Sequence, residues 1–162
     1  MITQNRIKEL FDYKDGQLIR KTNRGRGKNS TRWKEGTPIG HQSGKYVLAS
    51  VDYTLYKLHR LIWLWHFGSF PEKHIDHIDG NPSNNRIENL REANNSENMQ
   101  NQRKARVNNK LGIQGVYQVK NRFRAVLTTN GKTTHIGYFD NANQAHEAYL
   151  IEKRKQHSFG TI

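Results

Sequence analysis

Hydrophobic residues in the first half of the chain predict two short helices separated by strands. The first helix would bury four residues at helical spacing: Ile2, Ile7, Leu10 and Phe11. Asp15-Gly16 predicts a turn into a strand, and residues 44–56 hold enough aromatic and β-branched residues for a hairpin. The second helix has an apolar face of its own: Leu58, Leu61, Ile62 and Trp65. Gly68 and Pro71 would end this helix.

The pattern after residue 70 predicts a strand, a hairpin, a second strand and a helix. Ile75-Asp76-His77 is the first strand, and Asp79-Gly80 is expected to turn the hairpin directly after it. The helix would run from Ala93 to about Arg103, with Asn94 or Asn95 as its N-cap.

The last fifty residues alternate between polar and apolar positions before a final amphipathic helix. Residues 116–119, 122–128 and 132–139 are predicted strands, and Asn130-Gly131 predicts the turn between the last two. The helix at 143–157 would face the sheet with four residues: Ala145, Ala148, Tyr149 and Ile151. These patterns predict an α+β protein that ends in a three-stranded antiparallel sheet packed on one helix.

The charge balance indicates a polyanionic partner. The 162 residues include 27 Lys and Arg against 14 Asp and Glu, a net charge of +13, and nucleic acid is the commonest partner of such chains. From residue 101 onward there are eleven basic and three acidic residues, so this smaller part carries more than half of the net charge. An anionic membrane would require a basic helix with a large apolar face, and the sequence predicts none.

Several other classes of protein are excluded by composition. There is no cysteine, which excludes disulfides, thiolate zinc sites and a cysteine nucleophile. The longest apolar run, Leu61 to Phe67, is interrupted by His66 and is too short to span a bilayer. The N-terminus lacks the charged and apolar pattern of a secretion signal. We expect a soluble cytoplasmic protein, in the bacterial host cell if a phage encodes it.

Two basic segments are candidate contacts to a nucleic-acid backbone. Residues 20–34 hold seven basic residues and no acidic one, and either a solvated loop or a flexible arm on DNA would explain them. Residues 102–111 are polar and basic without an apolar period, which indicates a linker that lies along phosphates. The candidate contacts in the two segments are Arg24, Arg26, Lys28, Arg103, Lys104 and Arg106.

Asp76-His77 and the asparagines that follow carry the most specific chemistry of the chain. A carboxylate and a later side-chain oxygen can hold one hard divalent cation, and a histidine beside them can remove a proton from water. Together they can cut a phosphodiester bond. Alternatives remain for each residue: Asp76 and Asp79 could shape a turn, His77 could be an ordinary strand residue, and Asn98 could be a solvated helix residue.

Residues 59–101 resemble HNH nucleases of the phage and intron homing-endonuclease type. The shared elements are His59-Arg60-Leu61, then Ile75-Asp76-His77-Ile78-Asp79-Gly80-Asn81, then Asn84-Asn85-Arg86-Ile87-Glu88-Asn89-Leu90-Arg91, and then Asn98. The resemblance implies a ββα-metal (HNH) nuclease core with Asp76 and Asn98 as metal ligands and His77 as the general base. It also implies that Asn89 holds the loop after the His77 strand in place. The resemblance and the positive charge of Arg60 together imply that Arg60 binds a phosphate. Asn98 stands where the third letter of HNH would be a histidine. Because a neutral amide oxygen is a ligand for hard cations, one Mg²⁺ or Mn²⁺ ion per active site is expected in preference to Zn²⁺.

Residues 112–160 resemble the DNA-binding domain of plant ethylene-response factors. The matching elements are Gly115-Val116-Tyr117, Phe123-Arg124-Ala125, His135-Ile136-Gly137-Tyr138-Phe139-Asp140, Ala145 and Ala148-Tyr149. The resemblance implies that the sheet enters the major groove of DNA. Strand alternation assigns candidate contacts to its outer face and turns: Tyr117, Lys120, Arg122, Arg124, Lys132 and His135. A solvated charged face is the alternative, and Val119 replaces an expected arginine, so the base preference of the plant domains is not carried over.

The sequence therefore predicts four segments and a nuclease function. The segments are a basic leader that contacts DNA at 1–58, a nuclease core at 59–103, a linker at 104–111 and a DNA-binding domain at 112–162. We expect a metal-dependent enzyme that hydrolyses double-stranded DNA, acts as a monomer and nicks one strand, because one active site per chain is visible. A catalytically inert DNA-binding regulator on the same scaffold is the first alternative, and an RNA-binding protein is the second.

Overall fold

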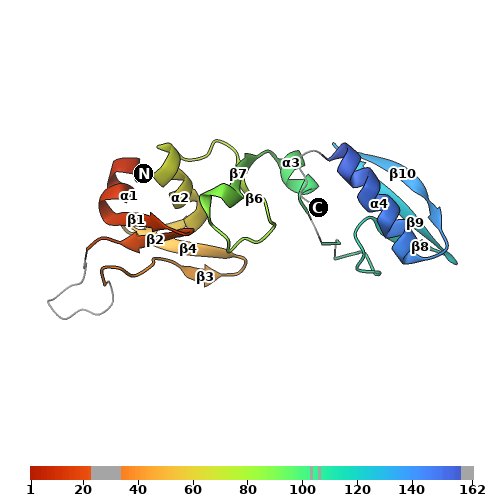
Figure 1. The fold of residues 1–162 in the computed structure, drawn as a ribbon, viewed down its shortest axis with the longest axis horizontal. Coiled ribbons are helices and arrows are strands. Elements are labelled where there is room, and N and C mark those ends of the chain that lie inside the picture. Colours follow the sequence, from red (N-terminus) through yellow and green to blue (C-terminus); the bar gives the residue numbers. More distant parts are fainter. Residues whose placement is uncertain (23–33, 103, 106, 158–162) are drawn as a thin grey trace. The chain divides into compact units, whose positions relative to one another are not determined.

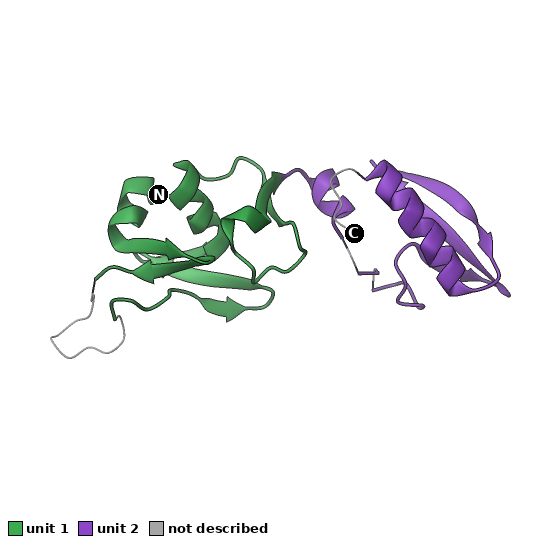
Figure 2. Cartoon of the chain, viewed as in Figure 1, with its two compact units in different colours: residues 1–92 green, residues 93–162 purple. Residues whose placement is uncertain are grey.

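The computed structural model describes residues 1–22, 34–102, 104, 105 and 107–157, and Figure 1 shows its mixed α+β architecture of short helices and small antiparallel sheets. The chain divides into two compact units, residues 1–92 and residues 93–162 (Figure 2). Within the described ranges, no helix is long and apolar enough to cross a membrane.

The first unit contains two helices, a two-stranded hairpin, a three-stranded meander and a second strand pair. Its elements in order are α1 (Gln4–Leu10), β1 (Phe11–Lys14), β2 (Gln17–Arg20), β3 (His41–Ser43), β4 (Tyr46–Val51), β5 (Thr54–Lys57), α2 (Leu58–Phe67), β6 (His74–His77), the 3₁₀ turn η2 (Ile87–Asn89) and β7 (Leu90–Ala93). The strands pair as β1-β2, β3-β4-β5 and β6-β7.

Local sequence explains where these elements begin and end. Thr3 caps α1 by accepting a hydrogen bond from the Arg6 amide. Asp15 and Gly16 both have positive φ angles, 48° and 81°, as a two-residue hairpin turn between β1 and β2 requires. Gly68 adopts a left-handed conformation (φ 84°) and ends α2, as its position in the sequence predicts.

One hydrophobic core holds the first unit together. Ile7 of α1, Leu18 of β2, and Leu61 and Ile62 of α2 are all fully buried in it. The described residues of the predicted leader, 1–22 and 34–58, therefore share one core with the first helix of the predicted nuclease core. Each such side chain contributes about 1.5–3 kcal/mol when it leaves water.

The predicted hairpin at Asp79-Gly80 is wrong. β6 pairs with β7, but residues 78–89 separate the two strands and form a long loop. The Asp79 carboxylate accepts hydrogen bonds from the Asn81 amide and from the side chains of Asn84 and Asn89. These contacts close the loop on itself. The Gly80 amide also donates to the His77 carbonyl (2.8 Å), so Asp79 and Gly80 turn the chain at the start of a long loop and not at the tip of a two-residue hairpin.

The second unit consists of a three-stranded antiparallel sheet, one long helix against it and one short helix. Its elements are α3 (Asn95–Gln100), β8 (Val116–Val119), β9 (Arg122–Thr129), β10 (Lys132–Phe139) and α4 (Ala142–Gln156), with strand order β10-β9-β8. Asn94 and Glu97 form a capping box at the start of α3. Figure 1 shows α4 lying along the sheet, as the sequence predicts.

The two faces of this sheet follow the predicted alternation. Ala125 and Leu127 are buried toward α4, and Phe123 packs against the same cluster. A β-bulge at Ile136 shifts the register between His135 and Gly137.

One predicted core residue of α4 is wrong. Ile151 is 52% exposed, whereas Lys153 is buried. Ala145, Tyr149 and Lys153 are four residues apart and form one stripe, and Ile151 lies off that stripe. Lys153 tolerates burial because its ammonium donates a hydrogen bond to the Gln102 carbonyl (2.8 Å).

Gln102, Asn109 and Gln114 are held by hydrogen bonds within the second unit. The Asn109 amide nitrogen donates to the carbonyls of Ile113 (2.7 Å) and Val116 (3.0 Å). The Gln102 carbonyl accepts from Lys153 and from the Gln114 side chain. The predicted linker is therefore attached to α4 and β8 at several points.

Candidate active site

Asp76 and His77 lie at the end of β6 and are both nearly buried, with exposed fractions of 6% and 5%. The pairing of β6 with β7 fixes their backbone, and the Ile78 amide continues it by donating to the Asn89 carbonyl (2.9 Å). Asp76 and His77, which are adjacent in the sequence, are thus held together at one site that is largely shielded from solvent.

Arg91 forms an ion pair with the carboxylate of Asp76. Its Nε and Nη2 atoms both donate to Oδ2 of Asp76, at 3.0 and 2.9 Å. Arg91 is on β7, directly beside β6, so the strand pairing brings the two charges together. The ion pair compensates a buried carboxylate and orients it.

The imidazole of His77 is fixed by two side chains. Its Nε2 lies 3.0 Å from Oδ1 of Asn85, in a hydrogen bond that is buried. The ring of His59, from α2, meets the His77 ring edge to face, with centroids 5.2 Å apart and planes at 89°. Tyr46 contacts His59 in turn, with centroids 5.4 Å apart.

Asn89 connects both ends of the loop at residues 78–89. Its Oδ1 accepts from the Asp79 amide, while Nδ2 donates to the Asp79 carboxylate and the Asn84 carbonyl. Burial of Asp79 opposes its ionisation, but the hydrogen bonds from Asn84, Asn81 and Asn89 outweigh this effect and lower its pKa.

His59 remains neutral at working pH, although sequence alone allows a solvated position. The side chain is 4% exposed, and this burial lowers its pKa to about 3, with His77, Lys57 and Arg60 acting in the same direction. His59 is therefore an uncharged partner of His77.

Acid should destabilise the first unit through His59. Because the pKa of His59 is about 3 when folded and about 6.5 when unfolded, the unfolded chain binds the extra proton between these values. Stability is complete above pH 6.5 and falls as pH decreases. His59→Phe should lose about 1.4 kcal/mol less than wild type between pH 7.5 and 5.5, measured by urea unfolding. Equal losses in both proteins would contradict the assignment, since other titrating groups are common to both.

Arg60 and Asn98 are not among the side chains described above that contact Asp76 and His77. The guanidinium of Arg60 lies over the Phe70 ring, 5.6 Å from its centroid. Asn98 is exposed on α3, in the second unit. Their predicted roles on phosphate and metal remain proposals.

Arg91 and Asn85 have no role in the prediction from sequence. Both lie within the motif at residues 84–91, but their partners are fifteen and eight residues away along the chain. Only the return of β7 beside β6 and the folding of the loop bring them to Asp76 and His77. In the sequence, only the many asparagines within residues 81–89 indicated that a side-chain amide would contact the site.

The donor set suits a hard divalent cation. Among the described residues there is no cluster of three or more acidic, histidine or cysteine side chains that could hold a metal ion. A single carboxylate with a neutral amide oxygen, however, is sufficient for Mg²⁺, which keeps several water ligands. Asp76 carries such a carboxylate in the first unit, and Asn98 carries an exposed amide in the second.

The outer face of the sheet in the second unit carries arginine between aromatic rings. Arg124 pairs across the strands with Tyr117 and Tyr138, and its guanidinium lies 5.9 Å from the Tyr117 ring centroid. Both tyrosines are exposed, at 37% and 45%. Arg122 lies 6.0 Å from the Tyr138 ring and 3.5 Å from the Asp140 carboxylate.

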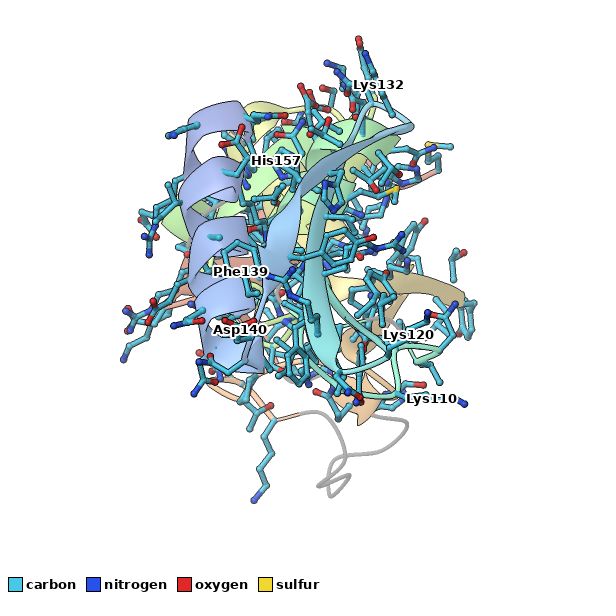
Figure 3. The ribbon with its side chains drawn as sticks, turned by 90° about the vertical axis from the view of Figure 1, so that its right-hand side faces the viewer. Lys110, Lys120, Lys132, Phe139, Asp140 and His157 are labelled. Carbon is cyan, nitrogen blue, oxygen red and sulfur yellow. The ribbon has the colours of Figure 1, made fainter. Side chains whose placement is uncertain are left out.

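The other predicted DNA contacts are spread around this sheet. Lys132 lies at the turn between β9 and β10, and Lys120 lies at the opposite end, between β8 and β9 (Figure 3). His135 and Lys104 are exposed. Five predicted contacts lie outside the described residues: Arg24, Arg26, Lys28, Arg103 and Arg106.

Comparison with known proteins identifies one domain. Residues 56–100 match the family model described as HNH endonuclease. The matched segment begins at the end of β5 and includes α2, β6, the loop with Asn85 and Asn89, β7 and α3. No curated protein matches the chain. No solved structure matches it either.

Proposed function

From the match of residues 56–100 to HNH endonucleases, we propose that this protein is a metal-dependent endonuclease that hydrolyses phosphodiester bonds in double-stranded DNA. The observation that carries the proposal is the buried Asp76-His77 pair inside the matched segment, with Arg91 on the acid and Asn85 on the base. Such a pair provides a metal ligand and a general base at adjacent positions.

The roles of the residues follow from their chemistry. His77, in its neutral form, removes a proton from a water molecule, and the resulting hydroxide attacks phosphorus in line with the departing 3′ oxygen. The products carry a 5′-phosphate and a 3′-hydroxyl. Arg91 holds the Asp76 carboxylate in position, and Asn89 holds the loop that returns from β6 to β7.

Asp76 and Asn98 are the proposed protein ligands of one Mg²⁺ or Mn²⁺ ion. When bound, the ion would supply positive charge to the scissile phosphate and the leaving oxygen. We assign a ββα-metal core of the homing type, in which β6, β7 and α3 are the three elements. One such site per chain favours nicking of a single strand by a monomer.

The sheet of the second unit is the proposed DNA-recognition surface, in the manner of the ethylene-response-factor domain. Arg124 between two exposed tyrosines, with Arg122 beside it, supports the proposal because guanidinium groups bind base edges and phosphates. Lys120 and Lys132 at the two ends of the sheet would contact the backbone on either side.

Arg124→Ala should weaken DNA binding more than removal of a similar charge elsewhere. We expect a loss of about 1–3 kcal/mol if Arg124 binds a base, or a salt dependence shallower by about one unit if it binds a phosphate. Arg154→Ala is the control, because Arg154 is exposed on α4, which packs on the opposite face of the sheet. The measurement is a fluorescence-anisotropy titration at several salt concentrations. Equal losses in the two variants would indicate non-specific attraction only.

Cleavage of a plasmid pool with random inserts tests the proposed function, because the pool supplies many candidate target sites. The protein is incubated with supercoiled DNA in Mg²⁺, in Mn²⁺ and in EDTA. Relaxed circles in either metal but not in EDTA are the expected result, and linear products would indicate cutting of both strands. Intact plasmid in all samples, with retarded migration on a gel, would favour the inert DNA-binding alternative.

A further inference from the structure

The side chain of Asn85 contacts the base of the proposed reaction. Its Oδ1 lies 3.0 Å from Nε2 of His77, and the side chains are 3% and 5% exposed. With Oδ1 of Asn85 directed at Nε2, as in this structure, Nε2 is the donor, because an amide oxygen can only accept a hydrogen bond. A neutral imidazole carries one N–H group, and therefore the lone pair of His77 lies on Nδ1.

The backbone of Asn85 is fixed on both sides. The preceding residue, Asn84, donates from its side chain to the Asp79 carboxylate (2.7 Å), and its carbonyl accepts from Asn89 (2.8 Å). On the other side, the Ile87 amide donates to the hydroxyl of Tyr13 (3.0 Å). The amide of Asn85 is thus presented from a loop with little freedom to move.

The β1-β2 turn supports the same loop from outside. A Cβ atom on Gly16 would lie only 2.9 Å from the carbonyl carbon of Asn85 and 2.7 Å from the Arg86 nitrogen. Backbone therefore meets backbone here without an intervening side chain. The hairpin of residues 11–20 reaches the active-site loop at the residue that contacts His77.

His59 restrains the ring of His77 in the other direction. The edge-to-face contact, at 89° between the planes, limits rotation of the imidazole about its last side-chain bond. With Asn85 on Nε2 and His59 against the ring, the two nitrogens of His77 are not interchangeable.

We propose that Asn85 is a positioning residue that holds His77 in the tautomer with the proton on Nε2, so that Nδ1 is the atom that accepts the proton from water. The role of Nδ1 as proton acceptor rests on the proposed nuclease function. The position of the proton on Nε2 does not depend on that function. Residues that orient a reacting histidine are worth about 10–100-fold in activity.

Asn85→Leu and Asn85→Asp form a matched pair of similar size, since only the aspartate keeps an acceptor oxygen. We expect Asn85→Leu to lower the single-turnover cleavage rate about 10–100-fold with unchanged DNA affinity, and Asn85→Asp to restore most of the rate. Asn81→Leu is the control, because Asn81 is an exposed asparagine of the same loop.

The tautomer is read directly by nitrogen-15 NMR of the wild-type protein. A slowly exchanging proton on Nε2 of His77 is expected in wild type and in Asn85→Asp, and its protection should be lost in Asn85→Leu. A proton on Nδ1 in wild type, or a normal cleavage rate in a folded Asn85→Leu variant, would overturn the proposal. If the wild-type protein cleaves no DNA, the nuclease function fails while the NMR result still decides the position of the proton.

Discussion

His77→Ala is expected to reduce single-turnover DNA cleavage by about 10²–10⁴-fold, the usual contribution of a positioned general base. Neither side chain that fixes the His77 imidazole, Asn85 or His59, offers a substitute base, since the amide of Asn85 does not take up a proton. His59 is the adjacent histidine, but its pKa of about 3 and its burial prevent it from exchanging protons with water at neutral pH. The measurement is the rate of nicking with enzyme in excess over plasmid.

His74→Ala is the matched control for this variant. His74 lies on the same strand, β6, but is exposed, so its loss should leave the rate unchanged. DNA binding by His77→Ala should equal that of wild type, because the sheet proposed for DNA recognition lies in the second unit and His77 is not among the predicted DNA contacts. Equal activity of His77→Ala and wild type would remove His77 from the mechanism.

Gly115→Ala is expected to destabilise the second unit by about 2–5 kcal/mol. The residue has φ of 74°, where a side chain costs about 1–2 kcal/mol. An added Cβ would also overlap the Cδ2 and Cε2 atoms of the Tyr149 ring, which is buried against the sheet, and such overpacking costs about 1–3 kcal/mol. Typical domains have only about 5–15 kcal/mol of stability, so thermal unfolding should begin many degrees lower.

Gly131→Ala separates the two contributions to this loss. Gly131 has a similar φ of 79°, but nothing lies within 4 Å of its added Cβ. This control should lose only the conformational part, about 1–2 kcal/mol. The comparison is made by differential scanning calorimetry of the whole chain. Equal losses in the two variants would mean that Tyr149 can move away without cost.

Local patterns were sufficient for most helices and turns. The spacing of Ile7 and Leu10, the Asp15-Gly16 turn, the end of α2 at Gly68 and the cap at Asn94 all depend on residues a few positions apart. The three-stranded sheet on α4 also follows from alternation and one Asn-Gly turn.

Contacts between distant residues were not visible in the sequence. The pairing of β6 with β7 across the loop at residues 78–89 is one example, because Asp79-Gly80 has the composition of a tight hairpin. Burial of Lys153 is another, because it depends on a carbonyl acceptor fifty-one positions away, at Gln102. Charged residues are predicted on surfaces unless such a partner is known.

In the candidate site, too, some residues could be predicted from local sequence and others could not. Adjacent residues such as Asp76 and His77 could be named from the motif, whereas Arg91, Asn85 and His59 could be assigned contacts only after folding. Their partners lie on a neighbouring strand, a loop and a helix. Motif spacing therefore indicates candidate reacting groups more readily than the groups that would hold them.

The attachment of Gln102 to α4 and of Asn109 to Ile113 and Val116 has a consequence for engineering chimeric enzymes. A recombination breakpoint at residue 111 would leave Lys153 buried without its acceptor at Gln102, and would detach Asn109 from the Ile113 and Val116 carbonyls. A transplanted specificity module should instead begin directly after α3, so that Gln102 and Asn109 stay with their partners while Asn98 stays with the proposed nuclease core. Libraries that exchange targeting modules between nucleases should therefore be joined between α3 and Gln102.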